Sequence, residues 1–225
     1  MPVDYNKKLV FVHIPKCAGT SVEKSMGVII QKSADESILE AGANSQSYDS
    51  LFGSDMQHWS INKIIKHLVV LNHNPNDFTF FCVVRDPYDR LVSHYYARNK
   101  AWVNQLNYTS ALKEYLFCLQ FVFVRFVDVL LPDSLHKVKR FVYPQYLHLR
   151  SQLDFVKLPA NFANIRVHTF SILDIFELDL FLQKFGCLSI THERKSISKP
   201  HPKTNSFRFL VSFFYHKDYL FYSSQ

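Results

Sequence analysis

The sequence has 225 residues, 48% of them hydrophobic, which is enough to bury a sizeable core and a little more than one ordinary domain needs. With 21 Phe and 12 Tyr but only 5 Gly, it falls outside the low-complexity and disordered classes, and we predict a single domain over residues 1–225. The formal net charge of +7 suits a partner that carries phosphate, sulfate or carboxylate groups, but the basic residues are scattered and the densest run (Lys137, Lys139, Arg140) is short, which disfavours nucleic acid.

The chain opens with a predicted strand, a loop and a helix. Residues 9–14 (LVFVHI) form a continuous apolar run that ends at Pro15, as expected of a strand buried on both faces of a parallel sheet. Thr20 or Ser21 is then placed to cap a helix, because residues 22–30 carry apolar side chains at roughly helical spacing.

An irregular stretch precedes the second predicted strand. Residues 33–54 are rich in Ser, Asn, Asp and Gly and predict a long surface excursion. Residues 61–68 predict a short amphipathic helix, followed by a turn over 72–77. Residues 78–84 (FTFFCVV) form the second buried strand, and a helix is expected to follow from about Asp89.

The remaining elements complete an alternating pattern. Residues 108–131 predict a packed core helix, 165–170 a third strand, and 172–185 a helix that stops at Gly186. Apolar residues within 207–214 at i, i+3, i+4 and i+7 predict a closing amphipathic helix. Strands alternating with helices predict an α/β fold, a three-layer sandwich with a central parallel sheet, whose ligands bind at the carboxyl ends of the strands.

The first segment that carries chemistry is residues 13–21, His-Ile-Pro-Lys-Cys-Ala-Gly-Thr-Ser, between a buried strand and a helix. At such a turn, backbone N–H groups and the helix N-terminus attract an anion, so we predict a P-loop-like phosphate-binding turn. Gly19 allows close approach, the hydroxyls add donors and Lys16 adds a mobile charge. The predicted phosphate-binding residues are Lys16, Cys17, Ala18, Gly19, Thr20 and Ser21.

Two other phosphate-loop chemistries do not fit these residues. A Walker A loop ending at residue 21 needs Gly at position 14 and Lys at position 20, where Ile14 and Thr20 stand. A cysteine phosphatase needs an Arg six residues after Cys17, but Glu23 stands there and would repel a phosphate.

The second segment is residues 84–96, Val-Arg-Asp-Pro-Tyr-Asp-Arg-Leu-Val-Ser-His-Tyr-Tyr, directly after the second strand. Arg85 at the strand end is able to make a bidentate contact with a phosphate, and Pro87 helps to set the turn into the helix. Ser93 lies two helical turns further on, so its hydroxyl is a candidate second ligand. Arg90 is expected to pack or pair nearby.

Together the two segments resemble the sulfotransferases that use 3′-phosphoadenosine 5′-phosphosulfate (PAPS), especially the carbohydrate-modifying, heparan- and chondroitin-type branch. Residues 15–21 resemble that family's 5′-phosphosulfate loop, and residues 85–95 match its 3′-phosphate motif at every fixed position. The resemblance implies that Arg85 and Ser93 hold the 3′-phosphate of PAPS. Residues 215–222 look like the family's closing helix, whereas residues 169–173 stand where the family's Glu-containing motif is expected, which puts acceptor contacts in doubt more than donor binding.

The implied reaction moves a sulfuryl group to a hydroxyl, with sugars as the expected acceptors and no metal required. Lys16 is the predicted catalytic cation next to the leaving 5′-phosphate. His58, followed by Trp and Ser, looks like the catalytic base of several glycan sulfotransferases. Glu23 is the alternative, because some relatives use a glutamate, and His73 and His94 come after it.

Other functions are kept open. A nucleotide or metabolite kinase with an atypical phosphate loop would need Mg²⁺, and a catalytically silent nucleotide-binding module would keep only the donor pocket. The glycan acceptor rests on the resemblance, on the positive charge and on aromatic side chains such as Trp59 and Trp102, expected to stack against sugars.

The expected cellular location rests on a search for signal peptides and membrane segments in the sequence. No apolar stretch reaches ~18 residues without charge, so we expect no signal peptide, no membrane segment and a cytoplasmic location, or the Golgi lumen if the chain is a fragment. The cysteines have no Cys-x-x-Cys spacing, so no zinc site or disulfide framework is expected and free thiols are predicted. They are Cys17, Cys82, Cys118 and Cys187.

Overall fold

The computed structural model describes residues 3–27, 56–102, 110–132, 135, 138–139, 146–190 and 205–224. The chain folds into two compact units. The sheet unit comprises residues 1–85 and 152–195, and the helical unit comprises residues 86–151 and 196–224. The single domain predicted over residues 1–225 stays a prediction, and the surface excursion predicted over 33–54 lies outside the described residues.

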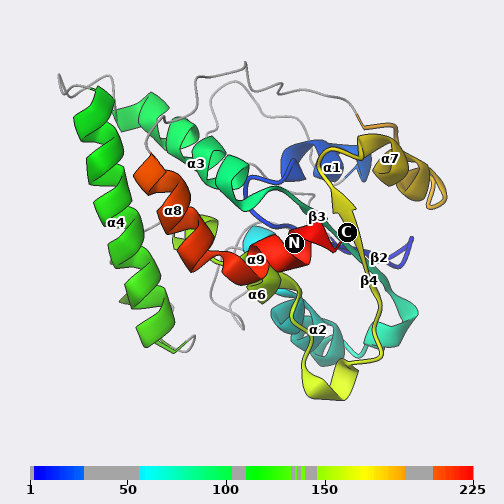
Figure 1. Cartoon of the computed structure of the whole chain (residues 1–225). Coiled ribbons are helices and arrows are strands. Elements are labelled where there is room, and N and C mark those ends of the chain that lie inside the picture. Colours follow the sequence, from blue (N-terminus) through cyan, green and yellow to red (C-terminus); the bar gives the residue numbers. More distant parts are fainter. Residues whose placement is uncertain are drawn as a thin grey trace. The chain divides into compact units, whose positions relative to one another are not determined.

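The sheet unit is built on a mostly parallel sheet of four strands in the order β1-β2-β3-β4. Figure 1 labels β2, β3 and β4 of this sheet. Strand β2 is parallel to β3 with Val12 opposite Cys82, and β3 is parallel to β4 with Val84 opposite Ser171. The short β1 is antiparallel to β2. The strands are β1 (Val3–Asp4), β2 (Leu9–Val12), β3 (Thr79–Val84) and β4 (Val167–Ser171). This sheet, flanked by helices, confirms the predicted α/β class, and β1 adds an edge strand that was not predicted.

Apolar strand residues make the core of the sheet unit. Every residue of β2 is buried, and so is every residue of β3 after Thr79. Phe11 stacks on Phe81 with ring centroids 5.0 Å apart, and Phe181 of helix α7 (Ile175–Gln183) packs on the Phe81 ring at 5.4 Å. The burial of both strands explains why they read as unbroken apolar runs.

The other helices of the sheet unit include one that begins earlier than predicted. They are α1 (Gly19–Ser25), α2 (Ile61–Val70) and α6 (Gln152–Val156), with 3₁₀ turns η1 (Met56–His58), η2 (Pro75–Asp77) and η6 (Ala160–Phe162). Helix α1 starts before the predicted caps Thr20 and Ser21, because left-handed Ala18 takes the N-cap position. Helix α7 starts later than predicted, at Ile175, and Gly186 with φ of 65° follows it as expected.

Among its described residues, the helical unit contains four longer helices, α3 (Pro87–Trp102), α4 (Ser110–Leu130), α8 (Asn205–Phe214) and α9 (His216–Ser223), and the 3₁₀ turn η5 (Tyr146–Leu149). Helix α3 begins at Pro87 rather than near Asp89, because proline's fixed φ and missing N–H suit the first position of a helix. Its core includes Phe121 of α4, Val211 of α8 and Tyr215.

Helix α4, predicted as a packed core helix over residues 108–131, buries only part of its described surface. Phe117, Phe121 and Val124 are buried in the core of the helical unit. In the described part of the chain, however, Phe123 and Phe126 are more than half exposed, at 56% and 59%. No helix among the described residues is long and apolar enough to cross a membrane.

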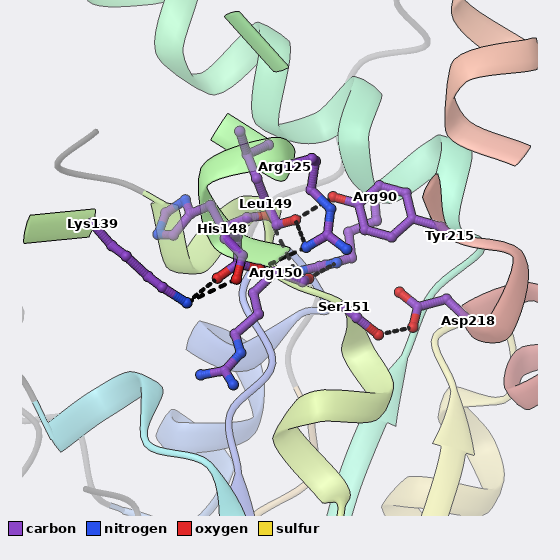
Figure 2. Close-up of polar contacts among 10 residues, drawn as sticks. Arg90, Arg125, Lys139, His148, Leu149, Arg150, Ser151, Tyr215 and Asp218 are labelled. Atoms are coloured by element: carbon purple, nitrogen blue, oxygen red, sulfur yellow. Dashed lines mark hydrogen bonds and ion pairs between the residues drawn. The ribbon is translucent and has the colours of Figure 1, made fainter. Parts of the chain in front are cut away.

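Side-chain donors hold the successive carbonyl groups at the end of η5 (Figure 2). Arg90 donates to the carbonyl oxygens of His148 and Arg150, at 3.1 and 2.8 Å. Arg125 and the Tyr215 hydroxyl both donate to the carbonyl of Leu149. Arg90 therefore has the packing and pairing role expected of it, and it stabilises the helical unit because buried carbonyls are costly to leave unpaired.

The same network contains buried charges and the chain's closing segment (Figure 2). Asp128 lies 2.8 Å from an Arg125 nitrogen and 2.9 Å from the Lys139 ammonium, all three side chains being less than 10% exposed. The Ser151 hydroxyl donates to Asp218, which is fully buried. Asp218 and Tyr215, which the resemblance assigns to a closing helix, thus lie in the packed interior of the helical unit.

Candidate active site

Two of the predicted phosphate-binding elements leave the sheet at the same edge. Because β2 and β3 are parallel neighbours with Val12 opposite Cys82, the loop that starts at His13 and the residue Arg85 both follow carboxyl ends of adjacent strands. Ligands of parallel α/β sheets bind at this edge. Both elements belong to the sheet unit.

The loop after β2 has the backbone geometry of an anion-binding nest. Lys16 and Ala18 have φ of 70° and 60°, whereas Cys17 between them and Gly19 after them are not in the positive-φ region. Such alternation turns successive N–H groups toward one point. Within the part of the chain that the structure describes, the N–H groups of Ala18, Gly19 and Thr20 have no protein acceptor. They are therefore available to an anionic oxygen.

Gly19 is required by a second contact, which the sequence did not indicate. A Cβ atom at this position would lie 1.9 Å from His13 Nε2 and 2.4 Å from its Cδ2. Real Cβ contacts are never that short, so the His13 ring occupies the space that a side chain would need. The loop and the His13 ring therefore fix each other.

A buried polar cluster extends from this ring. His13 Nδ1 lies 2.7 Å from Glu23 Oε1, so Nδ1 carries the proton that the carboxylate accepts. The amide of Gln57 donates to Glu23 Oε2 at 3.1 Å. The His13 and His58 rings meet edge to face with centroids 4.7 Å apart. The structure thus brings the predicted base, His58, against the residue that supports the predicted phosphate-binding loop.

With this geometry established, the comparisons identify the family. A model of the sulfotransferase family matches residues 1–223. The chain belongs to the sulfotransferase family. The family-level resemblance is thereby confirmed, and sulfuryl transfer is the chemistry that membership supports. No curated protein matches the chain, and neither does any solved structure.

In this sulfotransferase, the alternative bases differ in their surroundings. Glu23 is fully buried, and each carboxylate oxygen already accepts a hydrogen bond, so its place is to orient His13 and Gln57. His73 contacts the rings of Tyr5 and Phe78 just before β3 begins, at the opposite edge of the sheet from the loop. His94 is buried in the helical unit, with Nδ1 3.3 Å from His148 Nδ1.

The remaining predicted residues are placed as follows. Arg85 is half-buried, and in the described part of the chain its guanidinium makes no hydrogen bond or ion pair with protein. Ser93 is half-buried on α3 of the helical unit. Trp59 is only 2% exposed and packs on His67, so the prediction that it stacks against a sugar is wrong. The Trp102 side chain lies outside the described residues.

All four cysteines are free thiols, as predicted. Burial raises the pKa of the Cys82 thiol to about 12, so it stays protonated at neutral pH. Cys17, although it lies in the loop, is fully buried and donates its S–H to other groups. Among the described residues, no group of three or more His, Cys, Asp and Glu side chains is arranged to hold a metal ion.

Proposed function

We propose that this sulfotransferase moves a sulfuryl group from PAPS to a hydroxyl group of a carbohydrate. The observation that carries the proposal is the nest after β2, where the N–H groups of Ala18, Gly19 and Thr20 have no protein acceptor among the described residues. A dianionic 5′-phosphosulfate suits such a concavity, because backbone donors and Lys16 together offset its charge.

The two ends of the donor are assigned to the two motifs. Lys16, Cys17, Ala18, Gly19, Thr20 and Ser21 bind the 5′-phosphosulfate. Arg85 and Ser93 bind the 3′-phosphate, an assignment that rests on the motif resemblance and, for Arg85, on a guanidinium that no described protein group occupies. Adenosine nucleotides that lack the 3′-phosphate are expected to bind more weakly.

The transfer step is assigned to Lys16 and His58. As the acceptor oxygen bonds to sulfur and the bond between sulfur and the 5′-phosphate oxygen breaks, Lys16 stabilises the charge left on that phosphate. His58 takes the proton of the acceptor hydroxyl, and the products are a sulfate ester and adenosine 3′,5′-bisphosphate. Glu23 and His13 act behind His58 as positioning residues, since His13 contacts the His58 ring.

A carbohydrate acceptor is supported by the motif resemblance and by the net charge of +7, which suits the anionic glycans on which heparan- and chondroitin-type enzymes act. Trp59 is buried and offers the sugar no stacking surface. Chemically desulfated heparin and desulfated chondroitin are therefore the first acceptors to test.

The test is transfer of radiolabelled sulfur from PAPS to these glycans by matched pairs of variants. Lys16→Ala should lower turnover about 100-fold, while Lys24→Ala on α1 should not. Arg85→Ala should act mainly through donor binding, while exposed Arg166→Ala should not. His58→Ala should abolish transfer and keep bisphosphate binding, while exposed His216→Ala should leave both transfer and bisphosphate binding unchanged. Wild-type turnover by His58→Ala would remove the base assignment, and a wild-type chain that transfers no sulfur to any hydroxyl would overturn the proposal.

A further inference from the structure

Gln152 is a fully buried side chain that contacts both donor-binding motifs within the sheet unit. Its Oε1 accepts a hydrogen bond from the backbone N–H of Arg85 at 3.0 Å, and its Nε2 donates to the Arg85 carbonyl at 2.8 Å. The same Oε1 accepts from the thiol of Cys17 at 3.4 Å. One amide thus connects the residue after β3 with the loop after β2.

Gln152 supplies the backbone hydrogen bonds of Arg85 that β4 does not supply beyond Val84. The last contact of β4 with β3 is the bond from the Ile172 N–H to the Val84 carbonyl, so Arg85 lies one residue beyond the paired strand. Gln152 pairs with both backbone groups of Arg85, as a neighbouring strand would. This fixes the Arg85 backbone while leaving its guanidinium without a protein partner among the described residues.

The contact with Cys17 is weaker but is directed at the nest. Cys17 is buried and lies between Lys16 and Ala18, the two left-handed residues that give the loop its geometry. Its thiol is a weak donor, and Gln152 Oε1 lies nearer to the sulfur than the Pro15 carbonyl oxygen, which is 3.7 Å away. Movement of Gln152 would therefore disturb the loop and Arg85 together.

We propose that Gln152 is a positioning residue that sets the separation between the 5′-phosphosulfate loop and Arg85, so that one ligand reaches both. This inference rests on the proposed function. It predicts that loss of the amide lowers the affinity for a ligand with two phosphates more than the affinity for a ligand that engages only the loop. If the role of Gln152 were purely structural, its loss would lower the affinities for both ligands by the same factor.

The experiment compares Gln152→Leu with the wild-type chain by calorimetric titration with adenosine 3′,5′-bisphosphate and with adenosine 5′-monophosphate. Gln152→Leu should bind the bisphosphate about tenfold more weakly and the monophosphate less than about threefold more weakly. Gln183→Leu is the matched control, because Gln183 is an exposed glutamine of the same unit whose amide bonds only within its own surface region. It should change neither affinity.

A double-mutant cycle separates action through Arg85 from general destabilisation. If Gln152 acts by placing Arg85, Gln152→Leu added to Arg85→Ala should lower bisphosphate affinity no more than about twofold further. An additive loss, or an equal loss for both ligands, would overturn the inference.

Should Gln152→Leu fail to fold, Gln152→Glu keeps the shape and the acceptor but replaces the donor to the Arg85 carbonyl by a carboxylate oxygen. The same selective loss is then expected, and unchanged ligand preference counts against the inference. Failure of the wild-type chain to bind the bisphosphate would instead contradict the proposed function.

Discussion

Substitution of Gly19 by Ala tests the contact between the loop after β2, the proposed phosphate-binding loop, and the buried His13–Glu23 pair. The added Cβ would lie 1.9 Å from His13 Nε2. An ordinary contact needs about 3.5 Å, so the ring would have to retreat by roughly 1.5 Å. The other side of that ring is held by Glu23 at 2.7 Å, and Phe11 stacks on it at 5.4 Å.

A shift of that size would disturb the bond of the ring to Glu23, which is fully buried. Overpacking of a core and loss of a buried hydrogen-bond partner each cost about 1–3 kcal/mol, so we expect Gly19→Ala to lower the free energy of unfolding by about 3 kcal/mol. The loop would also move, and bisphosphate affinity should fall with it.

Urea denaturation followed by fluorescence measures the first effect, and calorimetric titration measures the second. Gly27→Ala is the control, since its Cβ meets no atom of the described residues within 4 Å and its φ of 72° is unfavourable; it should cost about 1 kcal/mol. In a His13→Ala background, Gly19→Ala should add less than about 0.5 kcal/mol, because the obstacle is gone. A Gly19→Ala chain within about 0.5 kcal/mol of wild type would refute this reasoning.

Three further predictions concern other sites. Ala18→Gly should raise the free energy of unfolding by about 1 kcal/mol in the same urea experiment, because Ala18 has φ of 60°; a loss of stability would contradict the left-handed loop. Asp128→Ala should cost about 3–5 kcal/mol, since it leaves Arg125 and Lys139 buried without their carboxylate, and a cost below 1 kcal/mol would show that the cluster is solvated. Burial, and then the nearby cations Arg166 and Lys184, lower the pKa of His168 below the ordinary 6.5. As the pH drops below about 6.5, the unfolded chain therefore binds this proton more readily than the folded chain, and the free energy of unfolding falls. In His168→Phe, the fall of the melting temperature between pH 7 and pH 5 should be shallower, and parallel curves would contradict the prediction.

The sheet and the two loops were predictable because their signals are local. Unbroken apolar runs placed β2 and β3 within one or two residues, and the chain's turns at Pro15 and Arg85 followed from where those runs end. Helix starts were less predictable. Left-handed Ala18, which decides the start of α1, is not a residue that capping preferences favour. Pro87 does suit the first position of α3, and the expected start near Asp89 overlooked it.

The supporting contacts were not predictable, because they join residues far apart in sequence. Gln152 meets Cys17 across 135 positions and Arg85 across 67, and no spacing rule indicates either contact. The His13–Glu23 pair is closer in sequence, yet a carboxylate on a helix is usually solvated and only the fold shows that it is buried. The one available signal was that His13 directly precedes the loop.

We propose that the chain has a donor site for a 3′,5′-bisphosphorylated adenosine. Calorimetric titration of the full chain with adenosine 3′,5′-bisphosphate, beside ADP and Mg-ATP under the same conditions, tests it most directly. We expect tighter binding of the bisphosphate, without magnesium, than of either other nucleotide. Preference for Mg-ATP would contradict the account and favour a kinase with an atypical phosphate loop.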